Sequence, residues 1–587
     1  MFFGLLLALC AALTPHAAIA GQTPLSLAKA QSFVELDEAW DFGQLPLDNA
    51  TGHLIFHSVA SLLQHWPNTL YRNGHSIVPG TVAPGTILYR ISPIPDIPTE
   101  PDWVATDPEH AAFFCHAVNA SSGCWQLTLM TTRTLKVLYF DGTSAAKMSG
   151  GTMDSQDLVI WSRLRPECSG ALGEFPRIRD LCRWGRKYGL DGFVRMEMNF
   201  ELMLCDFHNG AEVVSNLNLP SSDILPPLPS PEIPSPTEPE ALLPSPSGCG
   251  LPSTSSTSPP SLPLPNTANV FRTTESGSWH DHYPGEHRVH LDLTRFMSFF
   301  DTFLFPSLIS ARAGKARWEY RLEGITEEDV QMLQQRLEDL LGSGVEERTR
   351  GSDVDWRALV RVIMTRYEKR LEILHYLLRG KPSFEHGAIM PERNWTAIAI
   401  DAHDYLGGML NPYIVRSAVP PTDNLRSTNL SWAKPVFKAC ATTHTASLKA
   451  AFSSQFTRSE RLILESIQAT EKELCRVLVH AWADSSQLLK THQPGSGSGC
   501  LFEDAVRRWE NEISGLMDWL GWDVWVTCRP ACGPEEMCYL PGWLFAYENP
   551  KLPHGPVPKY PPVEAEGRPK PFCIREVPPF TENRQFH

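Results

Sequence analysis

The chain has 587 residues, of which 42% are hydrophobic and 20% charged, and its mean hydropathy is −0.20. A chain of this length exceeds what one hydrophobic core serves, so we expect two or more domains. The formal net charge of −15 excludes nucleic acid as a bulk partner, because phosphate binding needs a concentrated basic face.

The first twenty residues, MFFGLLLALCAALTPHAAIA, are apolar and end in small residues. An apolar stretch before an A-x-A-like cleavage site is typical of a secretory signal peptide, although the usual basic segment is missing. An uncleaved signal anchor is the alternative, and Pro15 and His16 disfavour it because they interrupt a short run. No later segment has the length of apolar sequence that a membrane span needs. We therefore expect a secreted protein, extracellular or cell-wall associated, with no integral span after cleavage.

The cysteines and the glycosylation motifs agree with a secreted protein. Of the fourteen cysteines, Cys10 leaves with the signal peptide, and an oxidising compartment favours disulfides among the thirteen that remain. The odd number leaves one thiol free or paired between chains. Four N-x-S/T sequons predict N-glycosylation, at Asn49, Asn119, Asn394 and Asn429.

The first elements in chain order are helical and then extended. Apolar residues of 53–66 recur at helical spacing, and Pro67 is expected to end that helix. A short buried strand is expected over 86–91. Asp107 has the properties of an N-cap, with Pro108 at the first helical position.

Strand patterns then dominate up to the linker. Residues 125–140 predict two strands, 175–188 predict an amphipathic helix, and 211–217 predict a final strand. Strict alternation over 194–204 predicts a strand with one apolar face and one solvated polar face. The polar face comprises Arg195, Glu197, Asn199 and Glu201. We therefore predict an α+β domain over 22–219, after a signal peptide at 1–20.

Composition changes abruptly after this domain. Residues 220–268 are rich in proline and serine, which predicts a disordered, extended linker. Helical periodicity returns in 269–527, which predicts a mainly α-helical domain. The last segment, 528–587, is rich in cysteine and proline and is expected to be a disulfide-bonded tail. Individual helices are expected after a cap at Thr326 and over about 353–378, 395–410, 431–452, 458–489 and 502–520.

Two clusters have metal-ligand residue types. Cys528, Cys532 and Cys538 could bind zinc, but an oxidising compartment and the absence of C-x2-C pairs favour disulfides. Four histidines follow the linker, and a solvated histidine-rich loop is favoured there over a zinc site. They are His280, His282, His287 and His290. We therefore predict no metal and no cofactor, and nucleotide-binding or hydrolase fingerprints are absent from the sequence.

The most specific enzymatic hypothesis concerns the α+β domain. Arg90 ends a predicted strand, Tyr139 lies on a second, and Glu197 and Glu201 lie on a third. An arginine, an aromatic residue and a late-strand glutamate, in this order, are similar to the arrangement in ADP-ribosyltransferases. There the glutamate binds a ribose hydroxyl and stabilises an oxocarbenium ion. The alternative is a polar sheet face with cross-strand pairs.

Several motifs carry a resemblance to a known family. YFDGTSAAK, GTMDSQDL and DGFVRMEMNFELMLCDF resemble a family of uncharacterised fungal secreted proteins from yeasts, moulds and mushrooms. The resemblance extends to WVATDPEHAAFF, RVHLDLTRFMSFFD and CYLPGW, and it implies an extracellular or cell-wall protein of unknown function. In that family His-Gly often follows the tyrosine where this chain has Arg90-Ile91, which argues against catalysis by Arg90.

The sequence therefore predicts a secreted glycoprotein that acts as a non-enzymatic extracellular or cell-surface interaction protein, with a partner outside the cell or in its wall. The alternative is a secreted ADP-ribosyltransferase-like or other small-substrate enzyme sited in the N-terminal domain. The sequence does not decide between them.

Overall fold

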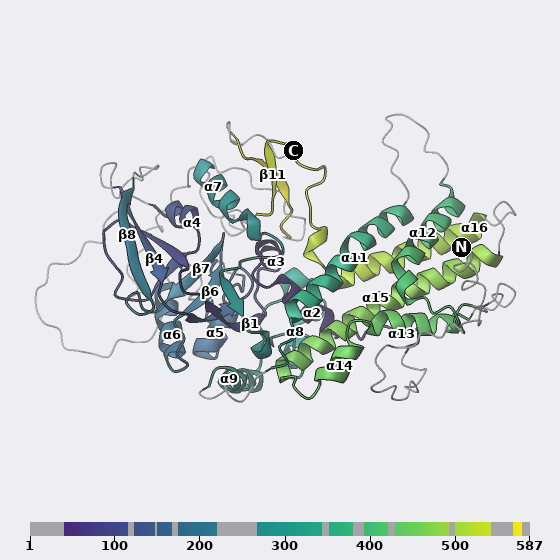
Figure 1. Cartoon of the computed structure of the whole chain (residues 1–587), viewed down its shortest axis with the longest axis horizontal. Coiled ribbons are helices and arrows are strands. Elements are labelled where there is room, and N and C mark those ends of the chain that lie inside the picture. The colour runs from purple at the N-terminus through teal and green to yellow at the C-terminus, as the bar shows by residue number, and fades with distance from the viewer. Residues whose placement is uncertain are drawn as a thin grey trace, which may run out of the picture. The chain divides into compact units, whose positions relative to one another are not determined.

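The structure is a computed structural model of the whole chain. It describes residues 40–115, 123–146, 150–166, 174–219, 267–342, 351–379, 393–420, 429–491, 499–541 and 568–577. The chain divides into two compact units. The sheet unit comprises 51–365, 452–467 and 521–587, and the helical unit comprises 1–50, 366–451 and 468–520. Figure 1 shows the elements of both.

A mixed sheet organises the sheet unit. Its strands follow the order β10-β1-β5-β6-β7-β3-β2-β4-β8, and β9 also pairs with β1. Among the described strands only β5 and β6 pair in parallel, whereas the other pairs are antiparallel. The strands are β1 (Ser76–Val82), β2 (Ile87–Ser92), β3 (Asp102–Ala105), β4 (Cys124–Thr131), β5 (Leu135–Phe140), β6 (Gly192–Met196), β7 (Phe200–Leu204), β8 (Ala211–Leu219), β9 (Val289–Leu291) and β10 (Met297–Ser298).

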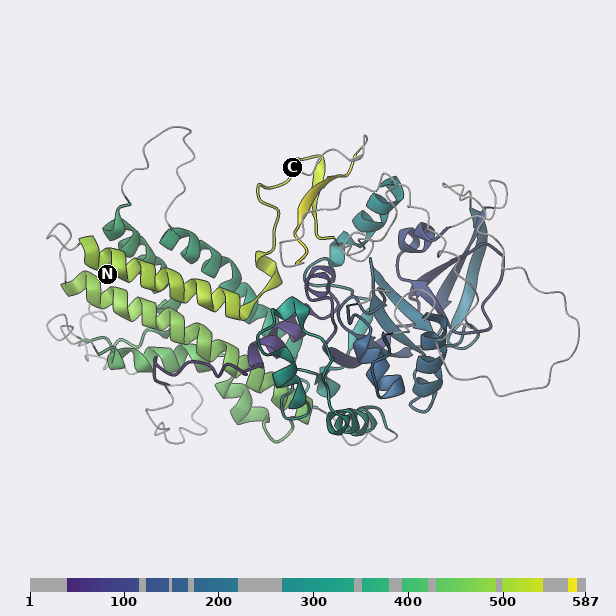
Figure 2. The same ribbon diagram turned by 180° about the vertical axis from the view of Figure 1, so that it is seen from behind.

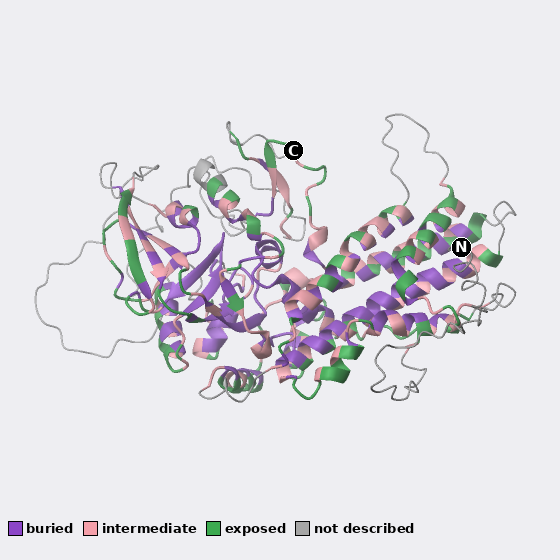
Figure 3. Ribbon diagram, viewed as in Figure 1, coloured by how far each residue is buried: buried purple, intermediate pink, exposed green. Residues whose placement is uncertain are grey.

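Helices cover both faces of this sheet. On one face, apolar side chains of the central strands, such as Phe140 and Phe193, form one buried cluster with residues of four helices. These helices are α5 (Asp154–Trp161), α6 (Glu174–Arg186), α8 (Ser307–Arg312) and α9 (Glu327–Leu341). The opposite face carries α4 (Pro108–Phe113) and α7 (Thr267–Gly277), as the front and back views in Figures 1 and 2 show. The central strands are consequently buried, while the edge strand β8 is largely exposed (Figure 3).

The predicted helix over 53–66 is two helices rather than one. The helix α2 (Gly52–Ser61) ends early, because Leu63 has a φ of 60°, which an α-helix cannot accommodate. The helix α3 (His65–Leu70) then begins on a new axis, and Pro67 lies inside its first turn instead of ending it. The corner places residues of both helices around one pocket.

The predicted strand over 194–204 is a hairpin. β6 and β7 pair antiparallel, and Arg195, expected on the same strand as Glu201, lies opposite it. The expectation of a solvated face was wrong, because Arg195, Glu197, Asn199 and Glu201 are all buried. Helices cover this face too, and the charges are compensated by one another instead of by water: Arg195 donates to both Glu201 and Glu174.

The strands and helix predicted elsewhere in the first domain are confirmed within a few residues, as β2, β4, β5, β8 and α6. The cap at Thr326 is also confirmed, since its hydroxyl accepts a hydrogen bond from the Asp329 amide. The predicted fold class, α+β followed by mainly helical, agrees with the structure. The signal peptide and residues 220–266 of the predicted linker lie outside the described residues, while 267–268 begin α7.

The helical unit contains most of the helices that the periodicity predicted, with the one expected over 431–452 divided into two. They are α12 (Trp395–Leu410), α13 (Lys434–Thr442), α14 (Ala446–Phe452), α16 (Gly499–Leu520) and the larger parts of α11 (Trp356–Arg379) and α15 (Arg458–Thr491). A disulfide joins Cys440 on α13 to Cys475 on α15. None of the described helices is long and apolar enough to cross a membrane.

The two units do not follow the boundaries predicted from composition. Strands β9 and β10 follow the linker in sequence, yet both pair with β1, so this part of the predicted helical domain completes the sheet. The tail also belongs to the sheet unit. There β11 (Glu536–Tyr539) pairs with β12 (Phe572–Arg575), and two disulfides link Cys528 to Cys538 and Cys532 to Cys573. The preference for disulfides over a zinc site in the tail is therefore confirmed.

Candidate functional site

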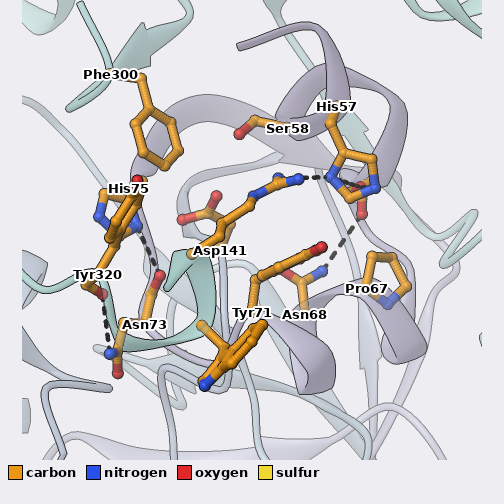
Figure 4. A pocket seen from close by; sticks show the side chains of 13 residues that line it. His57, Ser58, Pro67, Asn68, Tyr71, Asn73, His75, Asp141, Phe300 and Tyr320 are labelled. Carbon is orange, nitrogen blue, oxygen red and sulfur yellow. Dashed lines mark hydrogen bonds between the residues drawn. The ribbon is translucent and has the colours of Figure 1, made fainter. Parts of the chain in front are cut away.

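A pocket opens in the sheet unit beside the corner between α2 and α3. Together with the open solvent at its mouth it has a volume of about 420 Å³. Its polar and aromatic walls come from α2, α3, the loops that flank β1 and β5, and a turn near residue 318. Figure 4 shows the side chains converging on it. The lining residues are His57, Ser58, Ser61, Pro67, Asn68, Tyr71, Asn73, His75, Asp141, Phe300, Arg317, Trp318 and Tyr320.

His57 lies at the centre of a chain of three polar side chains. Arg317 Nη2 lies 2.8 Å from His57 Nδ1, and His57 Nε2 lies 2.7 Å from Asp523 Oδ1. Because a guanidinium only donates, Nδ1 accepts from Arg317 and carries no proton, while Nε2 carries the proton and donates to Asp523. The two contacts fix the tautomer and the orientation of the ring.

These contacts also fix the charge states. Burial and the nearby Arg317 charge lower the pKa of His57 to about 4, although Asp523 acts in the opposite direction. Burial alone would raise the pKa of Asp523, but its histidine neighbours hold that pKa well below its usual range. His57 makes the short contact, whereas His282 Nδ1 lies 3.9 Å from the other carboxylate oxygen. At neutral pH, Arg317 is therefore a cation, His57 a neutral imidazole and Asp523 a carboxylate.

Arg317 brings a cation to the pocket wall, linked to the Asp523 carboxylate through His57 and not by a direct ion pair. Its guanidinium carbon lies 3.8 Å from the centre of the Tyr71 ring, and Nη1 donates to the carbonyl of Gly521 at 3.1 Å. Among the described residues no carboxylate lies within ion-pair distance of it, and its Nε has no hydrogen-bond partner. A guanidinium in this position favours an anionic ligand.

A second histidine presents a bare nitrogen on the other side. His75 Nδ1 lies 2.7 Å from the carbonyl of Asn73, so that nitrogen must be the protonated one. Burial, reinforced by the charge of Arg312, holds the pKa of His75 well below its ordinary value. The ring stacks on Phe300 with centroids 4.4 Å apart, and its Nε2 has no partner. His75 is thus a buried acceptor with an unused lone pair.

Asp141 adds a carboxyl group whose charge changes near neutral pH. It accepts a hydrogen bond from the Ser76 amide at 2.6 Å, but burial raises its pKa to about 6. Nearby, Asn68 links the pocket to the sheet, since its Nδ2 lies 3.3 Å from the hydroxyl of Tyr139 and its Oδ1 accepts from the Gly142 amide.

Ser61, His57 and Asp523 together invite comparison with a nucleophilic triad. Ser61 Oγ lies 3.3 Å from His57 Nδ1, and the carboxylate lies on the other ring nitrogen. In a working triad the base has a free lone pair for the serine proton. Here Arg317 occupies that lone pair, and a pKa of about 4 makes the imidazole a weak base. The arrangement orients Arg317 and does not activate Ser61.

The four side chains predicted as a catalytic set do not converge. Arg90 on β2 and Tyr139 on β5 are separated by β6, β7 and β3, which corresponds to roughly 19 Å at the usual strand spacing. Arg90 instead pairs with Asp102 at 2.8 Å. Tyr139 is fully buried, and its pKa is raised by that burial.

The two glutamates of that set are engaged elsewhere. Glu201 accepts from Arg195 at 2.5 Å, and Glu197 Oε1 lies 3.6 Å from His110 Nε2 in the core. Their arrangement with Arg90 and Tyr139 therefore supplies no shared cleft for a nucleotide.

Other predicted sites have mixed outcomes. Asn49, Asn394 and Asn429 are exposed, as glycan attachment requires, while Asn119 lies outside the described residues. His282, His287 and His290 are exposed as expected of a solvated loop, but that expectation was wrong for His280, which is fully buried. Cys500 is a free, exposed thiol.

Sequence reasoning missed the pocket because its parts are far apart in the chain. His57 is 260 residues from Arg317 and 466 from Asp523. One local signal was available: polar residues recur at i, i+4 on the predicted helix over 53–66, at His53, His57 and Ser61. Buried polar residues need partners, so this spacing predicted a polar contact without naming the partners.

Comparisons with known proteins find uncharacterised relatives. The family described as the YPL277C N-terminal domain matches residues 119–235. The chain is similar to uncharacterized protein YOR389W of Saccharomyces cerevisiae, 23% identical over 572 residues, which cover 85% of this chain and 82% of that protein. It is also similar to uncharacterized protein YPL277C of the same yeast, 29% identical over 233 residues, 32% of this chain and 47% of that protein. No solved structure matches. The chain thus resembles uncharacterised fungal proteins.

Proposed function

We propose that the protein is a secreted fungal glycoprotein that acts by binding instead of catalysis, and that its pocket receives a small organic anion. The observation that carries this proposal is Arg317, a cation in the pocket wall with no carboxylate of the described residues within ion-pair distance. Removing charge from water is costly unless it is compensated, and an anionic ligand would compensate it.

The rest of the wall suits such a ligand. Tyr71 and Tyr320 offer aromatic faces, and His75 Nε2 and Asn73 Oδ1 are buried acceptors without partners. Acceptors of this kind would bind hydroxyl or amino groups on the ligand body while Arg317 binds its acidic end. The class that fits is a carboxylate on a compact, hydroxylated or ring-containing body.

The pairing around His57 supports binding over turnover. Its proton donates to Asp523 and its lone pair accepts from Arg317, so neither is free for a reacting group. Rigid hydrogen bonds on both ring nitrogens hold the guanidinium in one orientation. Such preorganisation lowers the entropic cost of ligand binding.

Secretion is supported by independent features. Ten of the described cysteines form five disulfides, which persist in oxidising compartments. Three sequons have exposed asparagines. The acidic net charge disfavours nucleic acid, so the proposed partners are extracellular or cell-wall components that carry a compact acidic group.

The binding proposal is tested with the full-length protein and Arg317→Gln. A thermal-shift screen of carboxylates, sugar acids and organic phosphates should find a stabilising anion, and calorimetry then measures its Kd. Loss of the charge should weaken binding by about 10- to 100-fold, the usual cost of a charge-assisted hydrogen bond. Arg183→Gln is the matched control, because Arg183 is an exposed arginine on α6.

Arg317→Lys separates charge from geometry, since lysine keeps the charge but not the two-pronged donor of arginine. Affinity between that of the native protein and Arg317→Gln is expected. Equal affinity of Arg317→Gln and the native protein for every anion that binds would contradict the assignment.

A small-substrate enzyme in the sheet unit is the second candidate. One observation favours it: the pocket holds Asp141, whose pKa is about 6, together with the bare Nε2 of His75. A carboxyl that titrates near neutral pH can act as a general acid or base. Incubation with labelled NAD and with the anions found by screening distinguishes the candidates, because an enzyme releases product and a binding protein does not.

A further inference from the structure

A second polar cluster lies in the core of the sheet unit, where the chain leaves β3 and where it approaches β9. Asp107, His280 and Glu286 place ligand-type atoms within 4.8 Å of one another. All three side chains are buried: Asp107 is 7% exposed, and His280 and Glu286 are 0% exposed. Carboxylate oxygens and an imidazole nitrogen are ligands of first-row transition metals.

The ring nitrogens of His280 are the second observation that points to this site. Neither Nδ1 nor Nε2 has a hydrogen-bond partner, although the ring is fully buried. Its Nε2 is directed toward the cluster, 4.0 Å from Asp107 Oδ2, which is too long for a hydrogen bond. Leaving a buried polar group unpaired costs about 1–3 kcal/mol, so a group in this state calls for an explanation.

The two carboxylates share one cation. Arg288 donates to Glu286 Oε1 at 2.7 Å and to Oε2 at 2.5 Å, and it reaches Asp107 Oδ1 at 3.1 Å. One guanidinium against two buried carboxylates leaves one formal negative charge. Asp107 Oδ2, the oxygen nearest to His280, makes the longest contact with Arg288, at 3.3 Å. The same oxygen accepts from the Thr106 hydroxyl at 3.2 Å, so both of its hydrogen bonds are long.

From this arrangement we propose that Asp107, His280 and Glu286 bind a divalent transition-metal ion such as zinc. Ligand atoms around zinc lie about 2.0–2.2 Å from the ion, so tetrahedral ligands lie roughly 3.3–3.5 Å apart. The present 4.0 Å between His280 Nε2 and Asp107 Oδ2 closes to that value with a small side-chain rotation. Arg288 is the positioning residue, because it orients both carboxylates and touches no ion itself.

The backbone holds this site firmly. Gly285 has a φ of 77°, and a Cβ there would lie 2.2 Å from the carbonyl oxygen of Leu63, so only glycine fits the turn. The amide of Glu286 donates to the same carbonyl at 2.7 Å, and the amide of Trp66 donates to the carbonyl of Asp281 at 2.9 Å. The loop from His280 to Arg288 is thus fastened to the corner between α2 and α3.

The imidazole also sets the class of ion. Calcium and magnesium prefer shells made of oxygen, whereas zinc, cobalt and manganese accept nitrogen with carboxylates. Zinc and cobalt are therefore the probes, and calcium is the control ion.

The test uses the full-length protein, stripped with a chelator and titrated with zinc against a chromophoric competitor. We expect one tightly bound zinc per chain, and we expect His280→Gln or Glu286→Gln to weaken binding by at least about 100-fold, since each removes a ligand outright. The matched control changes the exposed His282, His287 and His290 together to glutamine, and it should keep the tight site.

Cobalt gives a readout that needs no variant. Four-coordinate cobalt in the native protein should show strong visible absorption bands that zinc abolishes and calcium leaves unchanged. Absence of both stoichiometric zinc and cobalt bands in the native protein would overturn the proposal, even if the variants fail to fold. Tight zinc that survives His280→Gln and disappears in the triple variant would overturn it as well.

Discussion

At the scale of single residues, burial decides what the histidines of this protein can do. His57 is held neutral by burial and by Arg317, and its two ring nitrogens are committed to Arg317 and Asp523. The same residue type on a surface loop, as at His287, remains exposed. The chemical role of a histidine in this protein is therefore decided by its burial and its neighbours, and not by the residue type alone.

The low pKa of His57 has a consequence for stability. The unfolded chain binds a proton at His57 near pH 6.5, but the folded protein does so only near pH 4. Between these values the unfolded state holds more protons, so this group makes the free energy of unfolding fall as the pH decreases, by about 1.4 kcal/mol per pH unit. His57→Gln should flatten the pH dependence by that slope, as measured by denaturant unfolding between pH 4 and 6.5.

Comparison with the native protein is essential to this experiment. The raised pKa of Asp141 acts in the opposite sense, because there the folded protein holds the extra proton below about pH 6. Taking the difference between variants cancels the groups that do not contact the changed side chain. His208→Gln removes an exposed imidazole and should leave the slope as it is; an unchanged slope in His57→Gln would refute the assigned charge state.

At the scale of elements, local pattern predicted most helices and strands and failed where tertiary contacts decide. The helices α12, α15 and α16 follow their apolar periodicity closely. The break at Leu63 did not show in the periodicity, since apolar residues continue across it. The hairpin of β6 and β7 was read as one strand, because alternation is the same on both sides of its tight turn.

Burial of the polar face of that hairpin also needed tertiary information. Arg195 and Glu201 were expected on one strand but face each other across the hairpin, and Glu174, the further partner of Arg195, comes from α6. Likewise Asp107 was correctly placed as the residue before α4, yet its side chain makes no cap and turns to Arg288 instead. Sequence alone indicates that such residues are polar, not which partners they find.

One covalent contact between elements gives a direct test of the fold. A disulfide joins Cys182 on α6 to Cys205 just after β7, closing a loop with a sequence separation of 23. Loop-closure entropy for that length is about 3 kcal/mol. The variant Cys182→Ala/Cys205→Ala should lose stability of this order in denaturant unfolding. Cys500→Ala, which removes a free exposed thiol, should unfold like the native protein; equal stability of all three would contradict the pairing.

At the scale of the whole molecule, the sheet unit and its pocket depend on contacts that span most of the sequence. Strands that follow the linker complete the sheet at β1, and Asp523 reaches His57 from near the C-terminal end. Composition predicted the change from mixed to helical structure, but it cannot show that a later segment of the chain returns to an earlier sheet. For that reason the predicted fold class agrees with the structure while the predicted boundaries differ from the compact units.

Secretion makes a prediction at this scale too. Expressed in a yeast host, the protein should enter the medium with N-linked glycans that an endoglycosidase removes. Changing Asn49, Asn394 and Asn429 to glutamine should reduce the mass shift, because the three asparagines are exposed. Asn209→Gln, outside any sequon, is the control. A protein kept in the cell without glycans would contradict the proposed route.

Binding without turnover is the central claim, and ligand-observed NMR tests it most directly. The anion that gives the largest thermal shift is incubated with the native protein and with Arg317→Gln, and its spectrum is followed for a day. We expect saturable broadening of the ligand signals with the native protein, little broadening with the variant, and no new resonances in either sample. New resonances that grow with the native protein would contradict the account and establish an enzyme.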